Sequence, residues 1–183
     1  QVHKGIGQGE HFSSGRRRGL PSLDSLAWYH PPMGEGRQAN RRTWGAAAVL
    51  LLAGALRVYR LDDQNIWWDE GWTLWMARLD PGAIAIRTAV DAHPPLHYLL
   101  MHYWNQAAGA SAFAGRMFSV FAGLLMVAAL YRLGRYAGGA RLGLLAAGLL
   151  ALARFHVWWS QDIKNYTLAG AFALLSMWLT LRL

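Results

Sequence analysis

The sequence predicts an all-α, polytopic integral membrane protein, and three observations support this fold class. Only 15% of the 183 residues are charged and 54% are hydrophobic, whereas soluble domains usually carry about 25% charged residues. The apolar residues gather in four runs after residue 42. Basic residues flank these runs, in the pattern that sets membrane topology.

The four runs are predicted to be transmembrane helices at about residues 44–61, 115–135, 140–158 and 164–183. A hydrocarbon core of about 30 Å needs about 20 helical residues, and each run reaches that length once its flanks are counted. In the first run this requires Arg57 and Arg60 to extend toward the headgroups. The alternative is a soluble bundle of buried helices, but helices that are apolar on every side favour the membrane.

Residues 1–42 differ from the rest of the chain in composition. They contain scattered glycine and proline and a run of three arginines at residues 16–18, without helical or strand periodicity. We expect a disordered, basic, cytoplasmic tail. The segment does not resemble a signal peptide. Its first methionine is Met33, and we expect natural translation to start there.

Charge and cysteine content exclude some classes of function. The net charge is +8 and there is no cysteine, so disulfides and thiolate chemistry are excluded. Basic residues beside apolar runs mark topology instead of a nucleic-acid surface. We therefore expect the lipid bilayer as a partner and no nucleic acid.

Arginines beside the apolar runs give the predicted orientation. They lie before the first run, between the second and third, and after the fourth: Arg41, Arg42, Arg132, Arg135, Arg141 and Arg182. Positive residues mark the cytoplasmic side, so residues 62–114 and the turn near residues 161–162 are predicted to be extracytoplasmic in a multi-pass plasma-membrane protein. All carboxylates after residue 42 fall on that side: Asp62, Asp63, Asp69, Glu70, Asp80, Asp91 and Asp162.

The outer segment 62–114 is predicted to contain juxtamembrane helices. Residues 70–79 place Trp72, Trp75 and Met76 on one helical face, which is typical of a helix lying on the membrane surface. Residues 81–90 can form another helix. A third is predicted from Pro95 to Trp104, because proline suits the first helical turn. Polar residues interrupt this third helix, so we expect it to lie along the membrane; if it crossed, Asp162 would move to the side opposite Asp69.

Three motifs follow one another in this region. They read Trp-Trp-Asp-Glu at residues 67–70, Asp-Ala-His-Pro-Pro-Leu-His-Tyr at residues 91–98, and Trp-Ser-Gln-Asp-Ile-Lys-Asn-Tyr at residues 159–166. Together they resemble the signatures of glycosyltransferase family 39, the protein O-mannosyltransferases and aminoarabinose lipid A transferases. The resemblance implies a GT-C membrane fold and transfer of a sugar from a polyprenyl-phosphate donor to a lipid, protein or glycan acceptor. It also implies a longer protein, of which this chain is the N-terminal portion.

Asp69 is the predicted catalytic base. An inverting single displacement needs one base close to the anomeric carbon, and the resemblance assigns this role to the aspartate of the Asp-Glu pair. Glu70 is then expected to orient the acceptor or to tune Asp69. The alternative for Asp69 is a structural role as the N-cap of the following helix.

Asp162 is the second predicted catalytic residue, and a helix cap is again the alternative. The family pattern at this turn is commonly Gln-Glu-x-Arg-x-Tyr, and this chain has Asp162 for the Glu and Lys164 for the Arg. Lys164 therefore has a compact ammonium group where the family pattern has the planar, bidentate guanidinium of arginine. It is expected to contact the carrier phosphate. Gln161 and Tyr166 complete the predicted substrate contacts of this motif.

Asp91 and His93 have two interpretations. They can hydrogen-bond each other and shape a substrate-contacting turn, or they can hold a divalent metal together with another acid, although two ligands alone do not form a metal site. The other histidines are expected to pack at the interface.

Four tryptophans are predicted to form an aromatic belt at the membrane surface. They are Trp67, Trp68, Trp158 and Trp159. A second interpretation is that one of these indoles, such as that of Trp68, stacks against a sugar.

Two functions of different class remain from the sequence. The first is a lipid-linked-sugar glycosyltransferase, and the second is a non-catalytic membrane protein or transporter fragment on the same scaffold. Acids that converge at a membrane interface are usually functional. Convergence of Asp69 and Asp162 on one cavity is therefore expected for the first function.

Overall fold

The computed structural model describes residues 33–91 and 93–183, which form helices joined by loops and contain no strand. The chain divides into a unit of residues 1–37 and a unit of residues 38–183. Helix α2 (Met33–Val58) begins inside the predicted tail, at residues where the sequence shows no helical periodicity. The rest of the predicted tail, residues 1–32, lies outside the described residues.

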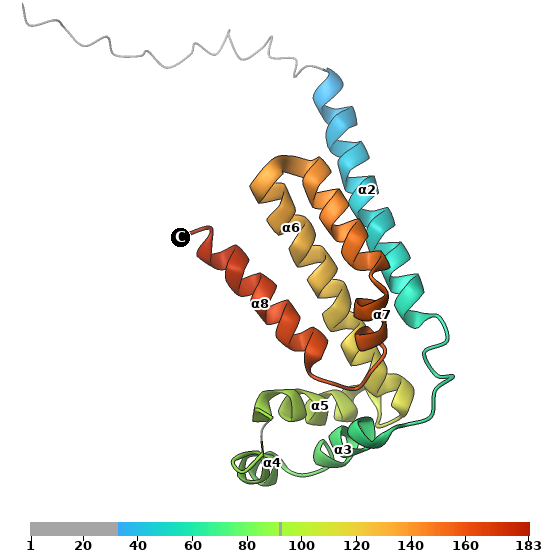
Figure 1. Cartoon of the computed structure of the whole chain (residues 1–183), viewed down its shortest axis with the longest axis vertical. Coiled ribbons are helices and arrows are strands. Elements are labelled where there is room, and N and C mark those ends of the chain that lie inside the picture. The colour runs from blue at the N-terminus through green and yellow to red at the C-terminus, as the bar shows by residue number, and fades with distance from the viewer. Residues whose placement is uncertain (1–32, 92) are drawn as a thin grey trace, which may run out of the picture. The chain divides into compact units, whose positions relative to one another are not determined.

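The long helices α2, α6 (Ala112–Leu152) and α8 (Tyr166–Thr180) run lengthwise, and shorter helices gather at one end of them (Figure 1). Helix α6 is a hairpin, because its backbone leaves the helical conformation at Gly138 and Gly139. Gly139 has φ 82°, a left-handed conformation that favours glycine. The two predicted spans at 115–135 and 140–158 therefore correspond to the arms of this hairpin.

The arms of α6 approach each other closely through glycine. A Cβ atom added at Gly134 would lie 2.8 Å from the Cα of Gly143, so the two backbones are nearly in contact. Small residues permit such close approach of helices in membranes, where packing and not hydrophobic burial drives association.

The helical class of the chain is confirmed, and the number of spans stays a prediction. Among the described residues one helix, Ala112–Leu152, is long and apolar enough to cross a membrane. Two shorter apolar helices occupy Thr43–Val58 and Tyr166–Thr180. They coincide with the first and fourth predicted spans.

The third predicted span is interrupted at Ala153, where the backbone is extended, and the chain continues as α7 (Arg154–Ser160). Arg57 fills this break. Its guanidinium donates to the carbonyl oxygens of Leu150 and Ala151, each at 3.3 Å, and to Ser160 Oγ at 3.2 Å. Arg57 is fully buried and therefore does not extend toward the headgroups as predicted, because the carbonyls near the break need donors.

The shorter helices α3 (Trp68–Met76), α4 (Pro81–Thr88) and α5 (Pro95–Ala108) match the three predicted juxtamembrane helices. Helix α5 lies across the ends of α6 and α8 instead of beside them (Figure 1). This arrangement is the one that the sequence analysis required for Asp69 and Asp162 to lie at the same end of the molecule.

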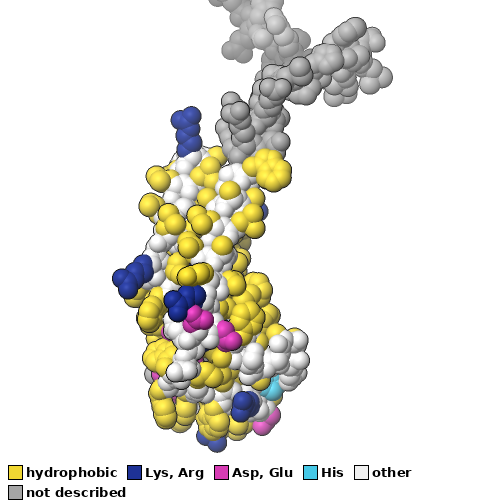
Figure 2. All heavy atoms as spheres, turned by 90° about the vertical axis from the view of Figure 1, so that its right-hand side faces the viewer, with side chains coloured by type: hydrophobic (Ala, Val, Ile, Leu, Met, Phe, Trp, Pro, Cys, Tyr) yellow, Lys and Arg dark blue, Asp and Glu magenta, His cyan; other side chains and the backbone are white. Residues whose placement is uncertain are grey.

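The carboxylates after residue 42 gather at one end of the helices. They belong to α3, the N-cap of α4 and the loops at that end, whereas Arg132, Arg135 and Arg141 flank the α6 turn at the other end. Figure 2 shows hydrophobic side chains over much of one face and acidic side chains in its lower part. The predicted gathering of carboxylates at one end is therefore present in the fold, whereas basic residues lie at both ends.

Candidate functional site

Asp69 lies in the first turn of α3. The N-cap of this helix is Trp67, which makes no side-chain capping bond, so the alternative of Asp69 as an N-cap is wrong. The Asp69 side chain is 36% exposed, and its Oδ2 lies 3.4 Å from Lys164 Nζ. A carboxylate is also favoured here by the helix dipole.

A pocket of about 500 Å³ joins the three sequence motifs. Its lining includes Trp68 and Asp69 from the first motif, Asp91 and His93 from the second, and Lys164 from the third. The volume is within the range of small-molecule sites, about 300–1,000 Å³. Segments far apart in the sequence thus meet at one cavity. The remaining lining residues were not predicted: Trp72, Met76, Arg87 and Val90.

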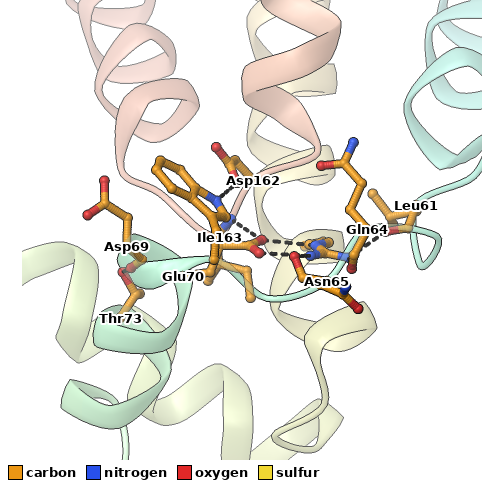
Figure 3. Close-up of polar contacts among 10 residues, drawn as sticks. Leu61, Gln64, Asn65, Asp69, Glu70, Thr73, Asp162 and Ile163 are labelled. Carbon is orange, nitrogen blue, oxygen red and sulfur yellow. Dashed lines mark hydrogen bonds and ion pairs between the residues drawn. The ribbon is translucent and has the colours of Figure 1, made fainter.

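Glu70 points away from Asp69 and into the protein (Figure 3). Its fully buried carboxylate accepts two hydrogen bonds from Arg116, at 2.9 and 2.7 Å, and one from the backbone N–H of Ile163 at 3.2 Å. This position differs from the predicted role at the acceptor. Glu70 instead connects α3 to α6 and to the turn before α8.

Arg116 is the residue that the sequence analysis missed as part of this network. Besides Glu70, it donates to the carbonyl oxygens of Leu61 at 2.9 Å, Gln64 at 3.0 Å and Asn65 at 3.5 Å. It therefore holds the loop between α2 and α3 in place. The available signal was a single arginine at the start of an apolar run on the acidic side of the molecule.

Asp162 does not line the pocket. It is 6% exposed and accepts a hydrogen bond from Trp67 Nε1 at 2.6 Å. Burial raises the pKa of its carboxyl, and nearby Glu70 raises it further, against the opposing effects of Trp67 and Arg116. The N-cap of α8 is Asn165, so the cap alternative for Asp162 is wrong too.

Asp69 and Asp162 thus lie at the same end of the molecule, but Asp162 is not part of the lining of the pocket that contains Asp69, which differs from the predicted convergence. The third motif reaches the pocket through Lys164, whose side chain is 6% exposed. The residue between them, Ile163, is fully buried and binds Glu70 through its backbone. The chain turns at this residue, so that Asp162 contacts Trp67 and Lys164 contacts Asp69 in the pocket.

The other residues predicted for the third motif have structural contacts. Gln161 donates to the carbonyl oxygens of Arg57 at 3.1 Å and Tyr59 at 2.9 Å, which closes the end of α2. Tyr166 packs edge-on against Trp159, with ring centroids 4.2 Å apart. Neither residue belongs to the pocket lining.

Asp91 and His93 form the predicted pair, with His93 Nδ1 3.3 Å from Asp91 Oδ1. Among the described residues no group of three or more His, Asp or Glu side chains could hold a metal ion. Two ligands alone do not form a protein metal site, so the metal interpretation stays a prediction. Their position favours the first interpretation, a turn that faces the pocket.

His97 lies behind the pocket, in contact with Tyr98 and Phe118. The side chain is buried, and neither ring nitrogen has a hydrogen-bond partner. Burial, followed by the charges of Lys164 and His93, lowers the pKa of His97 to about 4. A neutral packing role agrees with the sequence interpretation.

Fold and pocket together define a class of protein, namely an all-helical protein of membrane type with an acid–cation pocket at one end of its apolar helices. The family model described as dolichyl-phosphate-mannose-protein mannosyltransferase matches residues 92–183. The chain belongs to this family, which confirms the resemblance and supports glycosyltransferase activity in general. The match includes His93 and Lys164 and begins after Asp69. No curated protein and no solved structure matches the chain.

Proposed function

We propose that this chain forms part of an inverting membrane glycosyltransferase that uses a polyprenyl-phosphate sugar. In the proposed step the acceptor hydroxyl oxygen attacks the anomeric carbon of the sugar. The bond between that carbon and the phosphate oxygen breaks, and the polyprenyl phosphate leaves with the electron pair. Asp69 takes the proton of the hydroxyl as a general base.

The observation that carries the proposal is the 3.4 Å approach of Lys164 Nζ to Asp69 Oδ2 in the lining of one pocket. A displacement at a sugar phosphate needs a base on one side and positive charge for the departing phosphate. Two distant motifs supply these groups to the lining of one pocket. The family's printed description, which names a dolichyl-phosphate sugar donor, supports the same chemistry.

The position of the pocket supports a lipid-borne donor at an extracytoplasmic membrane surface. The pocket is lined by residues of α3, the last turn of α4, the α4–α5 loop and the turn before α8. These elements lie at one end of the apolar helices (Figure 1). A phosphate at headgroup depth can meet Lys164 there while its chain stays in apolar surroundings. The same position of the pocket, at one end of the apolar helices, supports a polytopic GT-C arrangement in which each of these helices spans the membrane.

The test is sugar transfer by the full-length protein, with labelled polyprenyl-phosphate sugars in membranes. We expect Asp69→Asn to lower kcat by roughly 100-fold or more, because general-base catalysis contributes about 10²–10⁴-fold. Lys164→Met should also lower transfer, whereas Lys164→Arg should restore part of it by returning a cation.

The matched control is Asp63→Asn, since Asp63 is an exposed aspartate on the same side that pairs with Arg60. We expect it to transfer sugar at the unmutated rate. If Asp69→Asn also transfers at that rate, the base assignment is wrong. If the unmutated full-length protein transfers sugar from none of the donors, a non-catalytic or transport role on the same scaffold becomes the better explanation.

A further inference from the structure

A second cavity, of about 220 Å³, lies between α2 and the two arms of the α6 hairpin. Its apolar wall consists of Ala46, Val49, Leu50, Val127, Ala128 and Ala147, and its other lining residues are Tyr131, Arg132 and Arg135. We name it the arginine cavity. Val127 and Ala147 are buried, whereas both arginines are exposed. The cavity therefore leads from exposed cations to a buried apolar wall.

The two arginines pack against aromatic rings. The Arg135 guanidinium lies over the Tyr131 ring, 5.6 Å from its centroid, and the Arg132 guanidinium lies over the Trp178 ring of α8 at 5.7 Å. The stem of Arg135 crosses Gly143 of the second arm, where an added Cβ would lie 2.9 Å from Arg135 Cγ. A guanidinium stacked on a ring keeps the N–H groups at its edge, so these contacts position both arginines and leave their donors for an anion.

No carboxylate balances this pair of arginines among the described side chains. The ion pairs that those side chains form lie at the opposite end of the helices, together with every carboxylate from residue 43 onward. Arg132 and Arg135 are three residues apart on one helix, a spacing at which like charges are neighbours and repel. A bound anion would remove this repulsion.

The cavity combines the two chemical features of an anionic phospholipid. The planar fork of arginine matches the oxygens of a phosphate, and Tyr131 adds a hydroxyl group. The alanine, valine and leucine wall offers no polar partner, so it suits an acyl chain, whose burial is favourable in proportion to its apolar area.

The depth of the cavity agrees with a lipid of one leaflet. The first arm of α6 leaves the helical conformation at Gly138. At about 1.5 Å per helical residue, the stretch from Val127 to Gly138 measures roughly 16 Å, and half of a hydrocarbon core of about 30 Å is about 15 Å. A phosphate at the arginines would therefore lie near headgroup level while its chain followed the apolar wall.

We infer that the arginine cavity binds an anionic phospholipid of the leaflet on the side of the α6 turn, with its phosphate at Arg132 and Arg135 and one acyl chain against the apolar wall. The predicted topology makes this the cytoplasmic leaflet, and basic pockets between membrane helices on that side suit anionic headgroups. The inference goes beyond the proposed function, because no step of sugar transfer involves this end of the molecule.

The experiment is native mass spectrometry of the full-length protein, released from detergent micelles that contain equal amounts of phosphatidylglycerol and phosphatidylcholine. We expect phosphatidylglycerol to be retained preferentially. The double variant Arg132→Gln/Arg135→Gln should lower its occupancy roughly tenfold or more, as expected when two arginines near a headgroup are lost. Arg141→Gln is the matched control, since Arg141 is exposed at the same end and is not part of the lining.

A second pair of variants tests the acyl-chain site. Ala46→Leu should lower retention of phosphatidylglycerol, because the larger side chain fills the cavity from α2. Ala48→Leu, at an exposed position of the same helix outside the lining, should not. An excess of inorganic phosphate should leave the lipid bound, because free phosphate lacks the chain.

Equal losses in Arg141→Gln and in the double arginine variant would show a general attraction to the basic surface and overturn the inference. Displacement by inorganic phosphate, or unchanged retention in Ala46→Leu, would reduce the cavity to a simple anion site. Equal retention of the two lipids would also contradict it, and so would their absence from the unmutated protein, the result expected if another part of the full-length chain fills the cavity.

Discussion

Asp69 and Glu70 are neighbours in the sequence, yet their side chains serve different purposes. Asp69 lines the charged pocket opposite Lys164, whereas Glu70 is buried against Arg116. The difference arises from the helix, since consecutive residues of a helix point about 100° apart. In the first turn of α3, the side chain of Asp69 therefore faces the pocket, whereas the side chain of Glu70 faces the protein interior.

Replacing either partner of the Glu70–Arg116 pair should destabilise the protein strongly. Glu70→Gln or Arg116→Met leaves one charge buried without its partner, and such losses cost about 3–5 kcal/mol. Denaturation in detergent measures the loss. The double variant should cost less than the sum of the single ones, because they share one interaction.

The control for this pair is Arg60→Gln, which removes an exposed ion pair with Asp63 and should leave unfolding unchanged, since exposed pairs contribute little. A Glu70→Gln variant as stable as the unmutated protein would contradict a structural role for Glu70.

Asp162 should make stability depend on pH. Because burial raises the pKa of its carboxyl, the folded state holds this proton more tightly than the unfolded state does. Its stabilising contribution is complete below the unfolded pKa and is lost as pH rises through the folded pKa. The groups that set this balance are Glu70, Arg116 and Trp67.

Asp162→Asn keeps an acceptor for Trp67 and cannot ionise. We therefore expect its Tm to exceed that of the unmutated protein near neutral pH, with the difference shrinking toward acidic pH. Thermal unfolding from mildly acidic to neutral pH measures this, with Asp63→Asn as the control. A constant difference in Tm across this range would contradict the assignment.

At the scale of elements, the α6 hairpin depends on the absence of side chains between its arms. Gly134→Val should destabilise the protein by about 1–3 kcal/mol, the usual cost of overpacking, because its Cβ would meet the backbone of Gly143 at 2.8 Å. Chemical denaturation measures the change.

Gly148 provides the matched control within the same helix. A Cβ atom there would meet nothing within 4 Å, so Gly148→Ala should be neutral or slightly stabilising, as expected from helix propensity. Equal effects of the two substitutions would show that the arms are not in close contact.

Helix positions were largely predictable from local patterns, but the break between α6 and α7 was not. The third apolar run continues through residue 153 without a proline or glycine at the break. What stabilises the break is Arg57, a residue about 100 positions away whose guanidinium binds the carbonyls near it. Such a partner is visible only once the chain is folded.

At the scale of the whole molecule, the prediction is that the acidic end and the α6 turn lie on opposite sides of a membrane. The chain has no cysteine, so single cysteines can be introduced without background. With intact cells and a membrane-impermeant maleimide, we expect Asp63→Cys to react directly and Tyr136→Cys, exposed at the α6 turn, to react only after permeabilisation. Equal labelling of both from outside would contradict the proposed topology.

The sequence by itself determined the helical class, the positions of the apolar and juxtamembrane helices, and the end of the molecule at which the carboxylates gather. These follow from composition, periodicity and proline, which act within a few residues. Tertiary structure alone decided which motif residues reach the pocket. Ile163 is buried against the Glu70–Arg116 network, and this contact turns Lys164 toward Asp69 and Asp162 toward Trp67. The direction of a side chain in a turn depends on such long-range contacts, and residue type does not encode it.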